Sequence, residues 1–252
     1  MAADDIDKIA TTLSKNKKCI FFTGAGISTE SGISDYRSKG GIWEQFRPIY
    51  YDDFMSSRDA RIEYWKRKIE LNGQLSNARP NRAHQAIAAL YEKGHVEAVI
   101  TQNIDGLHQE SGIPDNAVIE LHGNTRRIRC MKCSALSSVE DALARIKKGD
   151  PAPECSCGGY LKPDTISFGQ AMPEKEMSRS VILSKNCTCF IVVGSTLLVQ
   201  PASHLPGYAR EAGAFLGIIN LSETPYDKVC NVLIREKAGI TLQAIKDRVL
   251  VR

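Results

Sequence analysis

Short apolar runs, each ended by a glycine or by polar residues, recur along this chain and constrain its fold more than any other feature. The first run is Lys18–Thr23, which stops at Gly24. Runs of this length with such boundaries predict buried strands. Later runs share the pattern: Val96–Thr101, Val118–Leu121, Phe190–Gly194, Phe215–Leu221 and Val229–Ile234.

Helical patterns separate several of these runs. They are Asp4–Ser14, Ala83–Lys93 (which Gly94 ends), Pro201–Ala212 and Thr241–Val251. Buried strands that alternate with helices form a parallel sheet that helices cover on both faces. We therefore predict an α/β fold built on a parallel sheet.

Two stretches interrupt this alternation and predict an inserted, smaller lobe. Residues 36–80 are charged and aromatic, with helical spacing in their second half, and they predict a helical module. Residues 126–163 contain two cysteine pairs and a turn rich in proline and glycine, and they predict a zinc-binding module. The sheet domain would then comprise residues 1–35, 81–125 and 164–252.

Length and charge narrow the class of protein. A chain of 252 residues suits one large domain, or one domain that carries an insert. The net charge of +4 is mild compared with the dense basic surface of a dedicated nucleic-acid binder. The apolar runs are too short to cross a bilayer, and the first ten residues lack the pattern of a signal peptide. We expect a cytoplasmic monomer that binds neither a membrane nor nucleic acid.

The cysteines are grouped as metal ligands rather than as a disulfide framework. Two tight pairs, Cys130/Cys133 and Cys155/Cys157, offer four thiolates, which suits a tetrahedral structural zinc ion in a reducing compartment. A rival pair, Cys187 and Cys189, directly precedes a predicted core strand, so burial accounts for it better. Arginines beside the first pair could contact nucleic acid, although a solvated charged face is the simpler interpretation.

The first strand ends in a glycine loop, Thr23–Ser28. Glycines at this place let the backbone approach a pyrophosphate. The spacing gives only G-x-G, however, because Thr29 stands where the usual fingerprint has its third glycine. The Phe215 run ends at Asn220 instead of an acidic residue. The loop is either part of a dinucleotide pocket of variant design or a plain strand-to-helix turn.

Read together, the motifs resemble those of the sirtuin family, in the sirtuin order. The matching segments are GAGISTESGISDYRSKGGIW (24–43), TQNIDGLHQESG (101–112), ELHGN (120–124) and GST (194–196). The two cysteine pairs come after ELHGN. The resemblance extends from Cys19 to about Ala238. It implies a Rossmann-like NAD-binding domain with a small lobe made of a helical module and a zinc ribbon. It also implies an NAD-dependent protein-lysine deacetylase or deacylase with one structural zinc.

The resemblance also assigns residues to the expected site. NAD would be held by Gly24, Ala25, Gly26, Ser28, Tyr36, Arg37, Gln102, Asn103, Asp105, Gly194, Ser195, Asn220, Leu221 and Ala238. The acylated peptide would bind as an added strand at Phe168, Gly169 and Val199. The chain departs from the family pattern at Tyr36, Thr196 and Gln170, where phenylalanine, serine and glutamate are common.

The chemistry that the resemblance implies needs a base. The amide oxygen of the acyl-lysine attacks the ribose carbon that bears nicotinamide, and a ribose hydroxyl must then lose its proton. The products are nicotinamide, O-acyl-ADP-ribose and free lysine, an acyl transfer to ADP-ribose. An imidazole that titrates near neutral pH suits this step, so we expect His122 to be the base. Asn103 would orient the ribose or a water; a satisfied buried histidine is the alternative for His122.

The insert carries a further short motif, Tyr64-x-x-Arg67. The two residues lie on one side of a helix. This spacing resembles sirtuins that accept succinyl or malonyl lysine, in which the pair holds the distal carboxylate. The alternative is a solvated face formed by Lys66, Arg67 and Lys68, with plain deacetylation.

Two other functions remain open at the level of sequence. One is an NAD-dependent protein mono-ADP-ribosyltransferase, which would pass ribose to a protein nucleophile from the same pocket. The other is a non-catalytic zinc-ribbon module that senses NAD, for which His122 would be dispensable.

Overall fold

The computed structural model describes residues 2–35, 41 and 47–251, and within them the chain forms two sheets. The larger sheet has six strands in the order β3-β2-β1-β7-β8-β9, and all neighbouring strands are parallel. Its strands are β1 (Cys19–Thr23), β2 (Ala98–Thr101), β3 (Val118–Glu120), β7 (Cys189–Val193), β8 (Phe215–Ile219) and β9 (Val232–Ile234). The predicted runs all form strands, and the predicted α/β class is confirmed.

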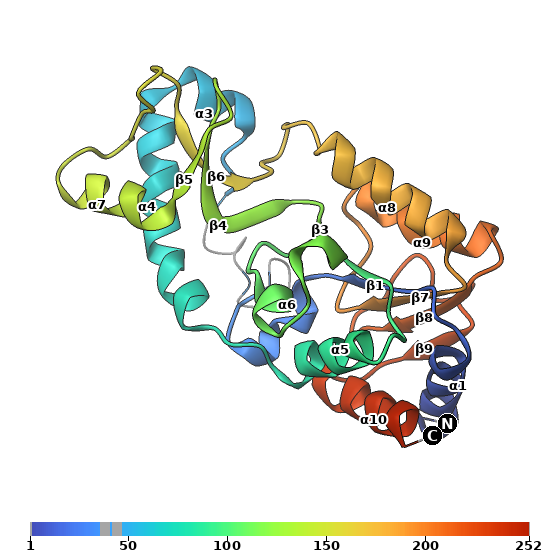
Figure 1. The fold of residues 1–252 in the computed structure, drawn as a ribbon. Coiled ribbons are helices and arrows are strands. Elements are labelled where there is room, and N and C mark those ends of the chain that lie inside the picture. The colour runs from blue at the N-terminus through green and yellow to red at the C-terminus, as the bar shows by residue number, and fades with distance from the viewer. Residues whose placement is uncertain (1, 36–40, 42–46, 252) are drawn as a thin grey trace.

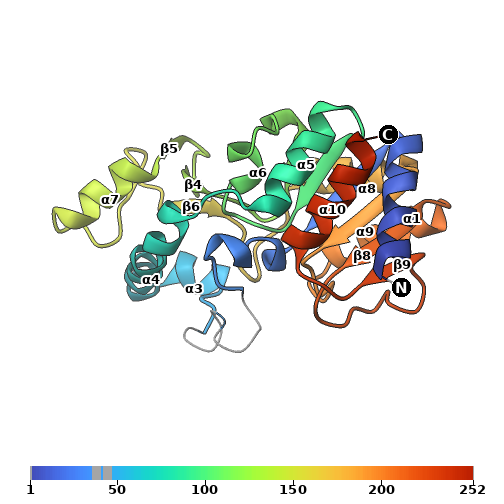
Figure 2. The same ribbon diagram turned by 90° about the horizontal axis from the view of Figure 1, so that it is seen from below.

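Helices cover both faces of this sheet (Figures 1 and 2). One face packs against α1 (Ala2–Lys15), α5 (Arg82–Glu92) and α10 (Ala238–Leu250), and the other against α8 (Glu174–Asn186) and α9 (Leu205–Glu211). Side chains of β1 alternate between the two cores: Phe21 joins the first cluster, whereas Ile20 and Phe22 join the second. Because both faces are buried, the strands are continuous apolar runs.

The strand order reverses beside β1. The chain runs from β1 to β2 and β3 on one side, and later to β7, β8 and β9 on the other. In an open parallel sheet, ligands bind outside the carboxyl ends of the strands where the order reverses. In this protein that point lies between the carboxyl ends of β1 and β7.

A smaller lobe stands beside the domain that contains the six-stranded sheet (Figure 1). It contains the antiparallel sheet β5-β4-β6, formed by β4 (Gly123–Cys130), β5 (Leu136–Ser138) and β6 (Leu161–Thr165), with α7 (Val139–Lys147). Two helices, α3 (Tyr51–Ser56) and α4 (Arg58–Asn77), complete it. Trp65 of α4 is buried against Ile128 and Leu161, and its Nε1 donates to the Leu161 carbonyl at 3.2 Å. This tryptophan fixes α4 to the small sheet.

Some elements differ from the predicted ones. Helix α8 was not predicted, because its most buried residues are Ser180 and Ser184 while Ile182 is exposed, so its apolar spacing is misleading. The predicted helix 201–212 is a 3-10 turn (η4, Ala202–His204) followed by α9. The remaining short elements are η1 (Ala25–Ile27), η2 (Thr29–Ser31), α6 (Leu107–Glu110) and η3 (Asp115–Ala117).

The segment after the glycine loop is also different from expectation. The strand β1 leads into the 3-10 turns η1 and η2 rather than directly into an α-helix. A strong helix macrodipole therefore does not point at the loop from these residues.

No helix in the described part of the chain is both long and apolar enough to span a bilayer.

Candidate active site

The glycine loop packs tightly against the loop that follows β7. The Gly24 amide donates to the Val193 carbonyl at 3.0 Å, and the Gly26 amide donates to the Gly194 carbonyl at 2.9 Å. A Cβ at Gly24 would lie 2.7 Å from the Gly194 oxygen. Gly194 has φ +63°, and a Cβ there would lie 2.3 Å from the Ile27 nitrogen. Gly24 and Gly194 are thus required for the loops after β1 and β7 to pack against each other. This requirement holds whether or not a ligand binds there.

Three of the predicted site residues are joined by hydrogen bonds next to this loop. The Ser28 hydroxyl donates to Asp105 Oδ2 at 2.7 Å. The Asn103 amide nitrogen donates to Ser28 Oγ at 3.1 Å and to the Gly24 carbonyl at 3.2 Å. Asp105 also accepts the Leu107 amide at 2.9 Å, so it caps α6 as well as holding Ser28. The loops after β1 and β2 thus form one buried polar cluster.

A second layer of polar residues supports this cluster. Thr23 Oγ1 donates to Thr101 Oγ1 at 2.8 Å, and Thr101 Oγ1 accepts a hydrogen bond from the backbone N–H of Asn103 at 3.0 Å. His108 Nε2 lies 2.9 Å from Thr23 Oγ1, and its ring is 5.0 Å from that of His84. Burial lowers the pKa of both imidazoles, so both are neutral near pH 7. Sequence reasoning missed Thr23 and Thr101, although each is the polar last residue of an apolar run.

His122 follows the end of β3 and is oriented by the backbone. Its Nδ1 lies 2.9 Å from the Gln102 carbonyl oxygen. A carbonyl only accepts, so Nδ1 carries the hydrogen and Nε2 of the neutral ring carries the lone pair. Burial lowers the pKa of His122, and the hydrogen bond to Gln102 partly opposes that shift. The imidazole is therefore arranged as a proton acceptor through Nε2.

Gln102 connects His122 to the loop after β7. Its side-chain oxygen accepts the Ser195 hydroxyl at 2.7 Å, and Ser195 Oγ accepts the Leu197 amide at 3.3 Å. The residues Gln102, His122 and Ser195 come from three strand ends. Gln102 thus links the other two predicted residues, His122 and Ser195, through hydrogen bonds to its backbone and side-chain oxygens.

The remaining predicted NAD residues lie further along the sheet. Asn220 is buried at the end of β8, and its amide donates to the Ser222 carbonyl at 2.8 Å. Leu221 is 64% exposed, whereas Ala238 is buried at the start of α10. The predicted residues Tyr36 and Arg37 lie outside the described residues.

A cavity of about 240 Å³ joins this cluster to the small lobe. Ala25, Ser28, Asn103 and Asp105 line it on one side. From the small lobe and the segments next to it come Tyr64, Arg67, Lys68, Thr165 and Phe168. His122, Gln102 and Val199 do not line the cavity.

The predicted peptide residues lie at different depths. Phe168 is 42% exposed, its ring centroid is 6.0 Å from that of Tyr50, and its carbonyl accepts the Tyr51 amide at 2.9 Å. Gly169 has φ +81°, in the left-handed region that favours glycine. Val199 is half-buried before η4. Phe168 and Gly169 thus form an exposed turn, and Phe168 also lines the cavity.

The two cysteine pairs form one cluster. The Sγ atoms of Cys130, Cys133, Cys155 and Cys157 all lie within 4.8 Å of one another. Two of the separations are 3.5 Å (Cys130 to Cys157) and 3.8 Å (Cys133 to Cys155). Zinc bound at about 2.3 Å from each sulfur would set tetrahedral sulfurs roughly 3.8 Å apart, so the cluster fits a structural zinc ion.

The backbone around the cluster supports that assignment. The amides of Lys132 and Cys133 point at Cys130 Sγ, at 3.4 and 3.5 Å. Gly158 has φ +75°, and a Cβ at Gly159 would lie 2.5 Å from Cys130 Sγ. The rival residues Cys187 and Cys189 are buried elsewhere, as their place before a core strand predicted. The shorter C-x-C spacing of the second pair therefore does not prevent the site from closing.

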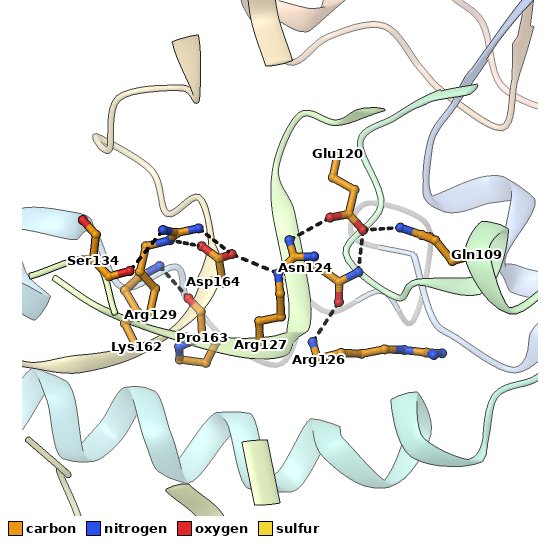
Figure 3. Close-up of polar contacts among 10 residues, drawn as sticks. All are labelled: Gln109, Glu120, Asn124, Arg126, Arg127, Arg129, Ser134, Lys162, Pro163 and Asp164. Atoms are coloured by element: carbon orange, nitrogen blue, oxygen red, sulfur yellow. Dashed lines mark hydrogen bonds and ion pairs between the residues drawn. The ribbon is translucent and has the colours of Figure 1, made fainter. Parts of the chain in front are cut away.

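An ion-pair network ties the small lobe to the end of β3 (Figure 3). Glu120 accepts Gln109 at 2.7 Å and Arg127 Nη2 at 2.8 Å. Arg127 Nε also donates to Asp164 at 3.1 Å, and Asp164 accepts Arg129 at 2.6 Å. Glu120 lies two residues before His122 in the chain, so the network anchors the segment that carries the histidine.

The arginines beside the first cysteine pair are thus engaged within the protein. Arg126 pairs with Glu110 at 2.6 Å, in addition to the pairs of Arg127 and Arg129. Lys132 donates to the Cys157 carbonyl at 3.2 Å. Each of these three arginines is paired with a carboxylate, which accounts for the charged face without a nucleic acid.

Comparisons with known proteins agree with this geometry. The profile of the Sir2 family matches residues 24–201. A protein of Bradyrhizobium diazoefficiens named NAD-dependent protein deacetylase 1 is 47% identical over 238 residues, which are 94% of this chain and 93% of that one. The NAD-dependent protein deacetylase of Sulfolobus acidocaldarius is 38% identical over 96% and 94% of the two chains.

Solved structures of Sir2 proteins are also similar to this chain. A structure described as Sir2 with a p53 peptide and NAD⁺ superposes with a TM-score of 0.88 at 33% identity, over 98% of this chain and 99% of that one. A structure of Sir2Tm bound to a propionylated peptide has a TM-score of 0.87 at 32% identity, with the same coverage. Each superposition thus covers nearly all of this chain.

Proposed function

This chain belongs to the Sir2 family, the sirtuins, and we propose that it removes acetyl groups from lysine side chains of proteins in a reaction that consumes NAD. The enzyme is an NAD-dependent protein-lysine deacetylase, and its products are nicotinamide, O-acetyl-ADP-ribose and free lysine. One observation carries the mechanism: the Gln102 carbonyl holds His122 in the tautomer whose Nε2 can accept a proton.

The buried polar cluster fits the expected cofactor. When bound, NAD supplies an electrophilic ribose carbon that takes up the acyl oxygen and releases nicotinamide. Asn103 and Asp105 line the cavity, and together they offer an amide and a carboxylate, which match the donors and acceptors of a carboxamide such as nicotinamide. Their hydrogen bonds to Ser28 and to the loop backbone hold them in place before any ligand arrives.

We assign the proton transfer to His122. Its Nε2 accepts the proton, and Nδ1–H then donates a charge-assisted hydrogen bond to the Gln102 carbonyl, which stabilises the imidazolium. The lowered pKa keeps the imidazole neutral, and so ready to act, at physiological pH. Asn103 orients the sugar or a water, and Asp105, Gln102 and Ser195 shape the cofactor pocket.

We infer that the rest of the ligand contacts follow the family. Gly24, Ala25 and Gly26 approach the pyrophosphate, while Gly194, Asn220, Leu221 and Ala238 hold the adenosine half. Tyr36 and Arg37 are assigned to the same cofactor by resemblance alone. The acylated peptide adds a strand beside Phe168, Gly169 and Val199, a common way to bind an extended segment.

In this proposal the two lobes of the chain have different functions. Residues 1–35, 81–125 and 164–252 bind the cofactor, whereas residues 36–80 and 126–163 form the small lobe. The zinc cluster includes Cys130 at the end of β4, and His122 directly precedes the start of that strand, so we assign the zinc a structural role. A monomeric state and a cytoplasmic location stay predictions.

The test is a single incubation of the purified protein with NAD and an acetyl-lysine peptide. We expect nicotinamide, the deacetylated peptide and O-acetyl-ADP-ribose in equal amounts, measured by mass spectrometry. A mono-ADP-ribosyltransferase would instead add the mass of ADP-ribose to a protein. A non-catalytic sensor would release no nicotinamide, and that result would overturn the proposal.

A further inference from the structure

The turn that carries His122 is short and is held at both ends by the main chain. It joins β3 to β4, and only Leu121 and His122 lie between the two strands. Leu121 is fully buried, and its amide donates to the Thr101 carbonyl at 3.0 Å. The His122 carbonyl accepts the Ile166 amide at 2.9 Å. Because the turn is so short, any change in the direction of either strand end would move the imidazole.

A bond between two side chains spans this turn (Figure 3). Glu120, the last residue of β3, accepts a hydrogen bond from the side-chain amide of Asn124, the second residue of β4. Asn124 is buried, and its Oδ1 accepts the Arg126 backbone N–H at 2.8 Å, which fixes the orientation of the amide group. Glu120 and Asn124 lie two residues before and two residues after His122. Their bond therefore closes a ring that contains the main chain of the histidine.

The same carboxylate, only 12% exposed, joins two further parts of the molecule. Its Oε1 also accepts Gln109 Nε2 of α6 at 2.7 Å, and its Oε2 accepts Arg127 Nη2 of β4 at 2.8 Å. A carboxylate only accepts hydrogen bonds and has about four lone-pair sites, so one side chain serves all three donors. Asp105 caps α6. Glu120 thus connects the His122 turn both to that helix and to the small lobe.

Arg127 extends the connection into the small sheet. Its Nε donates to Asp164 Oδ2 at 3.1 Å, and the same carboxylate accepts Arg129 at 2.6 and 3.0 Å. Asp164 lies on β6, and its carbonyl oxygen would collide with a Cβ at Gly123, the residue after His122. The ion pairs of the small lobe and the packing of β6 therefore meet at the turn that carries the histidine.

We propose that Glu120 is a positioning residue for deacetylation, because its carboxylate fixes the turn from which His122 presents Nε2. This inference rests on the proposed function, in which His122 is the general base. Glu120 is not among the residues that line the cavity, and its oxygens bond to Gln109, Asn124 and Arg127 rather than to the imidazole. It acts through the turn alone. Misplacing a reacting group by about 1 Å costs roughly 10²-fold in rate.

The main experiment is a double-mutant cycle between Glu120→Gln and His122→Ala, with kcat for an acetyl peptide measured in single turnovers. In glutamine, an N–H replaces one acceptor and faces another donor. We expect Glu120→Gln alone to lower kcat by about tenfold or more, the scale of a lost charge-assisted hydrogen bond. In the His122→Ala background the same change should have no further effect, because the group that Glu120 positions is gone. A merely structural role would lower both rates by the same factor.

The affinity for NAD separates this role from damage to the pocket. Calorimetry should give the same Kd for NAD in Glu120→Gln and in the native enzyme, so that the loss falls on kcat. Glu110→Gln is the matched control. The Glu110 carboxylate pairs with Arg126 and Arg79 instead of spanning the turn, so this change should leave kcat unaltered.

A second variant tests the bond from its other end, also in the event that Glu120→Gln does not fold. Asn124→Asp keeps the oxygen that accepts the Arg126 amide, but it sets a second carboxylate against Glu120. We expect kcat to fall as in Glu120→Gln. Combining the two changes exchanges donor and acceptor, because Gln at 120 donates to Asp at 124, and should recover part of the rate. A combined variant no faster than the slower single variant would contradict a bond across the turn.

The possible failures are distinguishable. If the native protein does not turn over the acetyl peptide, the proposed function fails. NMR then tests the turn alone, since the His122 Nδ1–H that faces the Gln102 carbonyl should exchange with solvent faster in Glu120→Gln than in Glu110→Gln. Equal exchange would overturn the inference. Where turnover is present, a native kcat in a folded Glu120→Gln, or an equal loss in both backgrounds of the cycle, overturns the positioning role and leaves the proposed function intact.

Discussion

The Gln102 carbonyl accepts a hydrogen bond from Nδ1 of His122 at 2.9 Å. The two residues follow different strands, β2 and β3, and the bond decides which nitrogen of the imidazole is basic. The side chain of the same glutamine accepts Ser195, on the loop after β7. Three strand ends are thus coupled through one residue, and the imidazole of His122 is oriented by a backbone carbonyl, which can only accept a hydrogen bond.

Replacement of the proposed base, His122, is the first prediction. His122→Ala should lower kcat by roughly 10²- to 10⁴-fold, the usual effect of losing a general base. The affinity for NAD, measured by calorimetry, should change little because His122 does not line the cavity. His95→Ala is the control, since the His95 ring lies against the Leu13 carbonyl, on a turn after α5. Near-normal turnover in His122→Ala would refute the assignment.

The pH profile of the native enzyme provides the second prediction. A base must be unprotonated to act, and burial lowers the pKa of His122. The acidic limb of kcat/KM for an acetyl peptide should therefore lie below about 6.5, the ordinary value for histidine. A limb at or above that value would show that His122 is not the titrating base.

Stability should also depend on pH, because His84 and His108 are buried as neutral rings. The pKa of His84 is lowered to about 4, and that of His108 is also lowered, both chiefly by burial. The unfolded chain then binds more protons as pH falls below about 6.5, so the free energy of unfolding decreases towards pH 4. Urea unfolding at pH 7 and pH 5 measures this loss. His108→Asn should reduce the difference, and an unchanged difference would contradict the prediction.

The glycine loop gives a steric prediction. Gly24→Ala would place a methyl group 2.7 Å from the Gly194 oxygen, so the two loops must separate. We expect a lower melting temperature and weaker NAD binding. Gly73→Ala is the matched control, since nothing lies within 4 Å of a Cβ there. In that helix, alanine should stabilise by about 0.5–1 kcal/mol. If both variants lost NAD binding, the loss could not be assigned to contact between the glycine loop and the loop after β7.

Zinc removal should act on the cavity through α4. Trp65 bonds to Leu161, and the Arg61 guanidinium stacks 3.6 Å from the ring centre of Tyr160, so α4 rests on the zinc-binding sheet. Cys157→Ser should release zinc, shift the fluorescence of Trp65 and reduce activity through disorder of the small lobe.

Metal analysis checks this directly, with Cys230→Ser as the control because Cys230 lies outside the cluster. Zinc retained in Cys157→Ser would show that the second pair is wrongly assigned.

The sequence by itself determined the parallel sheet, the cysteine cluster and the order of the motifs. Apolar runs such as 19–23 and 189–193 are buried on both faces, so their hydrophobicity is unbroken and easy to identify. The four thiols are recognisable because zinc needs that donor set at short spacing. His122, Asn103 and Asp105 stand in motifs, directly after such runs, where a parallel sheet presents its ligands.

Only the tertiary structure decided how polar side chains are oriented. The buried face of α4 is Arg61, Trp65 and Lys68, spaced at i, i+4 and i+7, and two of these three are charged. Hydropathy assigns such residues to solvent, although their spacing from Trp65 could have indicated a shared face. The tautomer of His122 and the Thr23–Thr101 bond depend likewise on partners brought from other strands. The direction of a hydrogen bond and the burial of a charge are properties of neighbours in space, which local sequence does not encode.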